Sequence, residues 1–159
     1  RPTSDRAREG LFSMLQSRLG SFEGLRVADL FAGTGALGLG ALSRGAAHCT
    51  FVEKDRMARD RIGRNIERLG AGPRSEVRAQ TIEHAGPPPA PCDLVLMDPP
   101  YGTSLAEVAL GRIADPAWLA PGALVSVETE RPVAPPPGFS LEAERRFGKA
   151  HITLLRPAD

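Results

Sequence analysis

The segment CDLVLMDPPY, residues 92–101, runs from an apolar stretch directly into an acid, two prolines and an aromatic residue. Neither Pro99 nor Pro100 has a backbone N–H, so neither can extend a sheet and the strand must end there. Asp98 is therefore left at the carboxyl end of a buried strand, the edge at which open α/β sheets bind ligands. The acceptor of Asp98, the two proline carbonyls and the flat face of Tyr101 suit a planar group bearing an NH2. A plain strand-ending turn is the alternative, because Asp-Pro is common in turns.

Length and composition are those of an ordinary globular domain. The 159 residues suffice for one core, and the 42% hydrophobic and 25% charged residues are typical values. The net charge of +1 gives no global attraction to nucleic acid. No apolar run approaches membrane-spanning length and no signal peptide is visible, so we expect a cytoplasmic protein. Cys49 and Cys92 both open predicted strands and are expected to be small buried residues rather than a disulfide.

A glycine-rich loop follows the first predicted strand, which covers residues 25–31. Its pattern, Gly33-x-Gly35-x-x-Gly38, matches the dinucleotide-binding fingerprint, in which glycines allow a tight turn and close approach of a ligand. The second predicted strand ends in Glu53, at the distance from the loop expected of a carboxylate that accepts ribose hydroxyls. Together the loop and the acid predict a cofactor that contains adenosine. Several nucleotide cofactors use similar loops, so the loop does not identify which one.

Hydrophobic periodicity and turn residues predict the other elements. We expect helices over about 5–19, from the glycine loop to Ser43, 56–69 and 105–113, with a short helical turn at 81–85. We expect the remaining strands over 49–53, 76–80, 92–97, 123–128, 139–146 and 149–156, the last two forming a closing antiparallel hairpin. This order predicts an α/β fold, a mostly parallel sheet with an antiparallel edge, as a single domain over 1–159.

Two features of the predicted helices have no single interpretation. Arg61, Arg64 and Arg68 share one helix face at i, i+3 and i+7. We interpret this face first as solvated, with RNA contact as the alternative. Gly40 lies inside the helix that ends at Ser43, where it lowers helix stability by about 1 kcal/mol relative to Ala. No sequence feature explains that glycine.

Several classes of site are absent from the sequence. The three histidines, His48, His84 and His151, are isolated, and there is no His-x-x-x-His or Cys-x-x-Cys pair. There is also no Gly-x-Ser-x-Gly elbow and no Gly-Lys-Ser/Thr loop. We therefore expect neither a metal site, a hydrolytic triad nor a P-loop.

Two motifs resemble those of class I methyltransferases. The segment DLFAGTGALG, residues 29–38, resembles their S-adenosylmethionine loop, and Asp98-Pro99-Pro100-Tyr101 resembles their Asp/Asn-Pro-Pro-Tyr/Phe motif for methylating amines. The segments RPTSDR (1–6) and ALSRGA (41–46), with the Trp118-Leu119 turn, narrow the resemblance to the RsmD family. That family consists of bacterial enzymes that methylate the N2 amine of one guanine in 16S ribosomal RNA. It favours Glu where this chain has Gly40.

The resemblance implies a Rossmann-like class I methyltransferase fold with a seven-stranded sheet and helices on both faces. It implies S-adenosylmethionine as cofactor, 16S ribosomal RNA or a partly assembled small subunit as partner, and an N-terminal segment (1–20) that closes over the cofactor. We expect a monomer without a metal ion. The implied catalytic residues are Asp98, Pro99, Pro100 and Tyr101. The implied cofactor-binding residues are Thr3, Arg8, Asp29, Phe31, Ala32, Gly33, Thr34, Gly35, Leu37, Glu53, Lys54, Gln80 and Thr81.

Other functions compatible with the sequence differ in substrate or in class. Another amine, such as adenine N6 or a protein glutamine, would use the same motif. A nicotinamide oxidoreductase would also use the glycine loop, but hydride transfer has no need of the motif at Asp98. A non-catalytic RNA-binding module is a third reading, and an intact Asp98 beside the loop argues against it.

Overall fold

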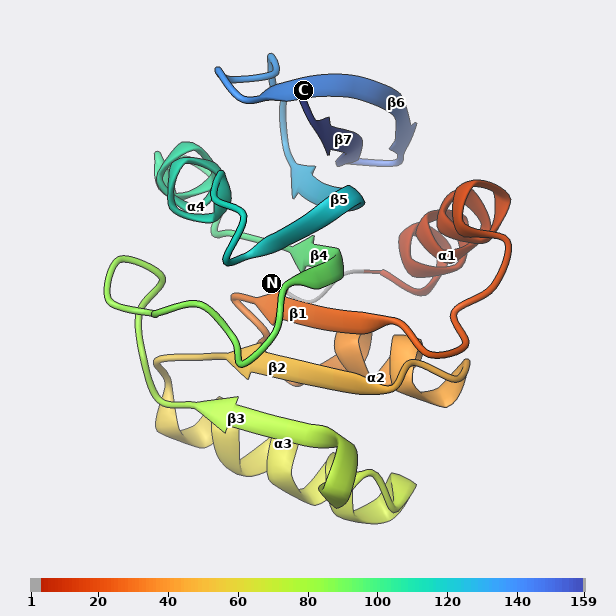
Figure 1. Ribbon diagram of the computed structural model, residues 1–159, viewed down its shortest axis with the longest axis vertical. Coiled ribbons are helices and arrows are strands. Elements are labelled where there is room, and N and C mark those ends of the chain that lie inside the picture. The colour runs from red at the N-terminus through yellow and green to blue at the C-terminus, as the bar shows by residue number, and fades with distance from the viewer. Residues whose placement is uncertain (1–3, 159) are drawn as a thin grey trace.

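One seven-stranded sheet in the order β3-β2-β1-β4-β5-β7-β6 forms the centre of the molecule (Figure 1). The computed structural model describes residues 4–158. The first five strands pair in parallel, and β7 is antiparallel to both β5 and β6. The strands are β1 (Arg26–Leu30), β2 (His48–Val52), β3 (Ser75–Arg78), β4 (Cys92–Met97), β5 (Leu119–Thr129), β6 (Phe139–Phe147) and β7 (Ala150–Pro157). The predicted mostly parallel sheet with a closing hairpin is confirmed.

Helices cover both faces of this sheet. One hydrophobic core packs α1, α2 and α3 against side chains such as Val27 and Leu94, and a second packs α4 against Val95 and Met97. Because alternate residues of a strand point to opposite faces, neighbouring positions of β4 enter different cores. The helices are α1 (Asp5–Leu19), α2 (Ala36–Ser43), α3 (Arg56–Leu69) and α4 (Leu105–Ile113), with a 3₁₀ turn, η1 (Gly72–Arg74).

Capping residues fix where the two longest helices begin and end. The Ser4 hydroxyl accepts the Ala7 N–H at 3.1 Å, and an Asp55 carboxylate oxygen accepts the Ala58 N–H at 2.9 Å. Each bond satisfies a backbone donor that the first helical turn would leave without a partner. Gly70 ends α3 in the left-handed conformation, with φ of 67°.

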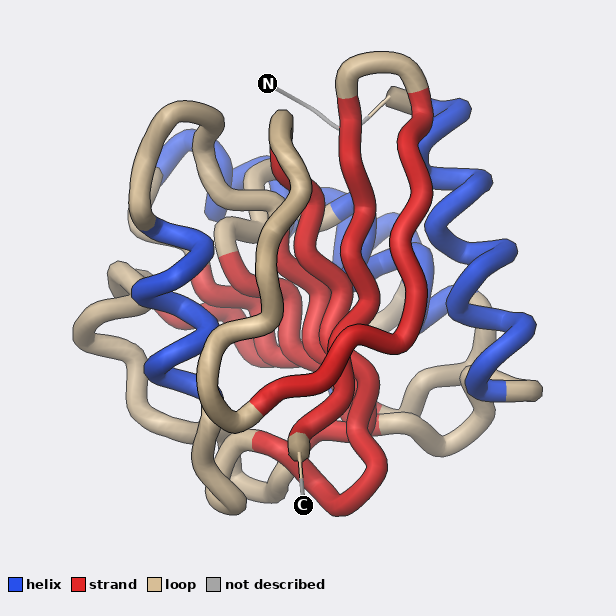
Figure 2. Tube along the Cα trace, turned by 90° about the horizontal axis from the view of Figure 1, so that it is seen from above, coloured by secondary structure: helices blue, strands red, loops and turns tan. Residues whose placement is uncertain are grey.

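Two glycines let α1 lie close to its neighbours. A Cβ on Gly40 would lie 2.7 Å from Cζ of Phe12, so the ring of α1 packs directly on the backbone of α2. This contact supplies the reason for Gly40 that the sequence lacks. A Cβ on Gly10 would lie 2.2 Å from the Phe147 ring, so α1 also packs closely on β6. Figure 2 shows α1 alongside the β6–β7 hairpin.

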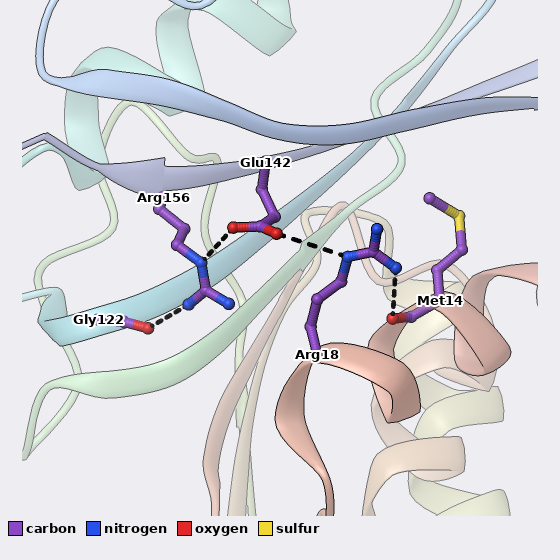
Figure 3. A network of polar contacts seen from close by, with 5 residues as sticks. All are labelled: Met14, Arg18, Gly122, Glu142 and Arg156. Atoms are coloured by element: carbon purple, nitrogen blue, oxygen red, sulfur yellow. Dashed lines mark hydrogen bonds and ion pairs between the residues drawn. The ribbon is translucent and has the colours of Figure 1, made fainter.

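A charged network ties α1 to the same edge of the sheet (Figure 3). Glu142 of β6 accepts a hydrogen bond of 2.7 Å from Arg156 of β7 and lies 3.7 Å from Arg18 of α1. The bond from Arg156 is the main reason that the pKa of Glu142 lies below its ordinary value. Arg156 also donates to the Gly122 carbonyl at 2.8 Å, so the network joins β5, β6, β7 and α1.

A few boundaries differ from those expected. The strand β3 ends at Arg78, so Gln80 lies in the following loop and not in the strand. The strand β5 begins at Leu119 and not at Ala123, because Leu119 already pairs with Cys92 before a register shift. The turn expected at 81–85 consists of single i to i+3 hydrogen bonds, such as His84 N–H to the Thr81 carbonyl at 3.1 Å. Cys49 and Cys92 are buried and not disulfide-bonded.

Two searches of the described chain returned nothing. Within residues 4–158, no helix has the length and apolar character needed to cross a membrane. The same residues contain no group of three or more His, Cys, Asp or Glu side chains arranged to hold a metal ion.

Candidate active site

A cavity of about 640 Å³ opens at the carboxyl ends of β1, β2 and β4. This volume falls within the usual range for small-molecule and cofactor sites. Most residues predicted from the sequence line it, although they come from five separate segments of the chain. They are Arg8, Asp29, Phe31, Ala32, Gly33, Thr34, Leu37, Glu53, Lys54, Gln80, Thr81, Asp98, Pro99, Pro100 and Tyr101. Thr3 lies outside the described residues, and Gly35 does not line the cavity.

The glycine loop explains why Gly35 is absent from the lining. Gly33 has φ of 59° and faces open space, so a ligand can approach its backbone. Gly35 has φ of 82°, and a Cβ there would lie 3.2 Å from Cγ1 of Ile62 and 3.3 Å from Cε1 of Phe51. Gly35 therefore faces the core and begins α2, where it permits a backbone conformation that other residues avoid. Its direct contact with a cofactor, expected from the sequence, is not supported.

Asp29 lies at the floor of the cavity and is only 1% exposed. One carboxylate oxygen accepts the Gly38 N–H at 2.9 Å, which joins the end of β1 to the first turn of α2. Burial raises the pKa of Asp29 well above its ordinary value, and the nearby carboxylates of Asp98 and Glu53 raise it further. The carboxyl group is therefore placed where a cationic ligand group would relieve its unfavourable surroundings.

Glu53 holds the loop as well as facing the cavity. Its Oε1 accepts the Gly33 N–H at 2.7 Å, and its Oε2 accepts the Asp55 N–H at 2.9 Å. The first bond fixes the glycine loop, and the second fixes the residue that caps α3. Sequence reasoning expected Glu53 to bind ribose and missed this second role. The left-handed Gly33 backbone that turns its N–H toward Glu53 is not visible in a residue pattern.

The motif that ends β4 occupies the opposite wall of the cavity. Asp98 and Tyr101 are half-buried, and Pro99 is buried. The Pro100 carbonyl accepts a hydrogen bond of 2.8 Å from the Thr103 hydroxyl. The expectation that both proline carbonyls lack a partner is therefore wrong for Pro100, whose carbonyl stabilises the turn. A carboxylate, a buried proline and a half-exposed phenol ring remain at the cavity surface.

Phe31 adopts an unusual backbone conformation beside the cavity. Its φ of 58° places a bulky residue in the left-handed region, which costs on the order of 1–3 kcal/mol. Such strain persists only where the surrounding structure enforces it. Here the preceding β1 strand and the following Ala32 N–H, which bonds to the Val52 carbonyl at 3.1 Å, enforce it.

Sequence reasoning missed part of the cavity lining. The additional residues are mainly apolar or come from the edges of predicted elements, so no motif distinguishes them. Ile82 and Leu105 had a usable signal, since each is an apolar residue next to a predicted site segment. The missed residues are Ala36, Val52, Ala58, Arg61, Ile82, Glu83 and Leu105.

The sequence matches, over residues 1–156, the family described as "Conserved hypothetical protein 95". This is the RsmD family. The chain belongs to it. The chain is 37% identical to "Ribosomal RNA small subunit methyltransferase D" of Escherichia coli K12, in a match covering 98% of this chain and 79% of that protein.

Solved structures of two bacterial proteins agree with this assignment. The fold matches "Putative methyltransferase yhhF" of Escherichia coli with a TM-score of 0.86 and 35% identity, covering 99% of this chain and 87% of that one. It matches a putative methylase of Haemophilus influenzae with a TM-score of 0.80 and 34% identity, covering 99% and 100%. The fold is that of class I methyltransferases, which favours methyl transfer over the oxidoreductase alternative.

Proposed function

We propose that this protein transfers a methyl group from S-adenosylmethionine to the exocyclic N2 amine of a guanine in 16S ribosomal RNA. The observation that carries the proposal is one cavity in which Asp98-Pro99-Pro100-Tyr101 faces the Gly33 loop and Glu53. A carboxylate next to proline and an aromatic ring suits an amine on a flat base, and the loop suits an adenosine cofactor. The ribosomal substrate is supported by the printed name of the Escherichia coli relative.

The residues around the cavity fit this cofactor. Its sulfonium and ammonium groups are cationic, and the cavity is lined by the carboxylates of Asp29, Glu53 and Asp98. The raised pKa of Asp29 shows that a positive charge is lacking at that point. The exposed backbone of Gly33 would hold the methionine part, Glu53 the ribose hydroxyls, and Lys54 with the Gln80-Thr81 segment the adenine. When bound, the cofactor supplies a methyl group already activated for transfer.

The remaining chemistry consists of positioning the acceptor amine. The lone pair of guanine N2 is delocalised into the ring, so the amine is a weak nucleophile. A hydrogen bond from N2–H to the Asp98 carboxylate would favour the positive charge that develops on nitrogen during attack. Stacking of the Tyr101 ring on a base flipped out of the RNA would fix the plane of the amine. Asp98 and Tyr101 thereby act on the acceptor, and the loop and Glu53 act on the donor.

A labelling experiment tests the proposal. Purified protein is incubated with methyl-labelled S-adenosylmethionine and either 16S ribosomal RNA or partly assembled small subunits, and the product nucleosides are identified by mass. We expect labelled N2-methylguanosine from the wild type and none from Asp98→Ala. Labelled N6-methyladenosine, or label in a protein glutamine, would replace the guanine acceptor with another amine. Absence of label in every substrate would contradict the proposed activity.

A further inference from the structure

One side of α3 carries a row of arginines that the cavity does not account for. Arg61, Arg64 and Arg68 are exposed, and their spacing of three and four residues aligns them along the helix. Among residues 4–158, none of the three side chains forms an ion pair or a hydrogen bond. Like charges at this spacing destabilise a helix by about 0.2–0.5 kcal/mol for each pair. The row therefore lowers helix stability without any compensating contact within the described chain.

The acidic residues of α3 lie on its other side. At 100° per residue, Asp60 and Glu67 project from the flank that also carries Arg56, and the row projects toward α2. A helix face that is merely solvated needs no such separation, and alternating charges would stabilise it better. The arrangement concentrates positive charge on the flank of α3 nearest to α2.

Between this row and α1 runs a shallow groove, which we name the α2 groove. Its floor is the outer face of α2, where Ala36, Gly40 and Ser43 carry little or no side chain. Arg8 of α1 lines one side, and Arg68 of α3 lines the other. The groove therefore has a low floor between guanidinium groups on two helices. Because Gly40 is also needed for the contact with Phe12, the low floor follows directly from the close packing of α1 on α2.

The α2 groove is continuous with the cavity. Arg8 and Ala36 line both, and Arg61, at the upper end of the arginine row, also lines the cavity. A chain lying in the groove would thus reach the cavity without crossing an acidic surface of α3. Arg44, whose guanidinium lies 4.0 Å above the Phe12 ring, adds a further cation at the far end of α2.

We propose that the α2 groove, with the arginine row of α3, binds the phosphate backbone of the RNA whose base enters the cavity. The inference rests on the proposed function, because it assumes an RNA substrate. Arginine suits this role, since its planar group can donate two parallel hydrogen bonds to a phosphate. The row from Arg61 to Arg68 spans about 10 Å of helix axis, enough for about three phosphates of one duplex strand.

The test compares the double variant Arg64→Gln/Arg68→Gln with Arg56→Gln. Both changes neutralise exposed arginines of α3, but Arg56 lies on the flank away from the groove. Affinity for a 16S ribosomal RNA transcript is measured between 50 and 200 mM salt, and calorimetry with S-adenosylhomocysteine checks the cofactor site. Each phosphate contact contributes about 0.7–0.9 to the slope of log K against log salt. Loss of two contacts should make the fold-loss of affinity over that range about 7–12 times smaller.

The expected result is this reduced salt dependence in the double variant, with S-adenosylhomocysteine binding unchanged and a wild-type slope in Arg56→Gln. A wild-type slope in the double variant, or an equal reduction in Arg56→Gln, would overturn the proposal. The slope does not depend on methyl transfer. If the wild type binds RNA but methylates none, the proposed activity fails, and the comparison of slopes still decides whether the groove binds the backbone.

Discussion

Replacing Glu53 should weaken cofactor binding and loosen the site at the same time. Its two carboxylate oxygens hold the Gly33 and Asp55 N–H groups at 2.7 and 2.9 Å. Glu53→Ala removes both bonds, and it also removes the acceptor proposed for the ribose hydroxyls. A simple ribose-binding acid would affect only the ligand. A residue with both roles should affect the ligand-free protein as well.

The two effects have different magnitudes. Glu53 is half-buried and water can replace part of each lost bond, so the two bonds together should stabilise the ligand-free protein by about 1–3 kcal/mol. For a chain of this size, that corresponds to a fall in Tm of about 2–12 °C. A charged hydrogen bond to the ribose should contribute about 1.5–3 kcal/mol, so Kd for S-adenosylhomocysteine should rise about 10- to 150-fold.

Thermal unfolding without ligand and titration calorimetry measure the two effects separately. Glu67→Ala is the matched control, because it removes an exposed carboxylate from the distant flank of α3 and should leave both values unchanged. Glu53→Gln keeps one acceptor oxygen and should give intermediate values. An unchanged Tm in Glu53→Ala would refute the structural role of Glu53. An unchanged Kd would refute its contact with ribose.

Three further outcomes are expected. Asp98→Ala should abolish methyl transfer in a single-turnover assay while calorimetry shows S-adenosylhomocysteine still bound, and near-wild-type rates would remove Asp98 from the mechanism. Tyr101→Ala should weaken RNA binding by about 1–3 kcal/mol and Tyr101→Phe should not, since stacking needs the ring; equal losses would point to the hydroxyl. Gly10→Ala should lower the free energy of unfolding by about 1–3 kcal/mol, because its Cβ would lie 2.2 Å from the Phe147 ring. Phe147→Leu should relieve part of that loss in a denaturant titration, and additive losses would contradict the packing.

Local signals in the sequence predicted the sheet and most of the site. Prolines end β4 at Asp98, and glycines mark the loop after β1, because these residues impose their own backbone conformations. Contacts between distant segments could not be predicted in the same way. Nothing near Gly40 in the sequence points to the Phe12 ring that packs on it. The inward direction of Gly35 likewise depends on Phe51 and Ile62, which are brought to it only by the folded sheet.

The convergence of carboxylates at the cavity has a consequence for stability. Asp29 is buried, and Asp98 and Glu53 raise its pKa further, so the folded protein binds its proton more tightly than the unfolded chain does. Stability therefore falls as pH rises above the ordinary value of 3.8, and the loss is complete above the raised pKa. An Asp29→Asn variant, which can still accept the Gly38 N–H, should gain stability relative to wild type over this rise in pH. The ionised wild type regains stability only from a positive charge, which the proposed cofactor would bring, so saturating cofactor should narrow the difference between the two proteins.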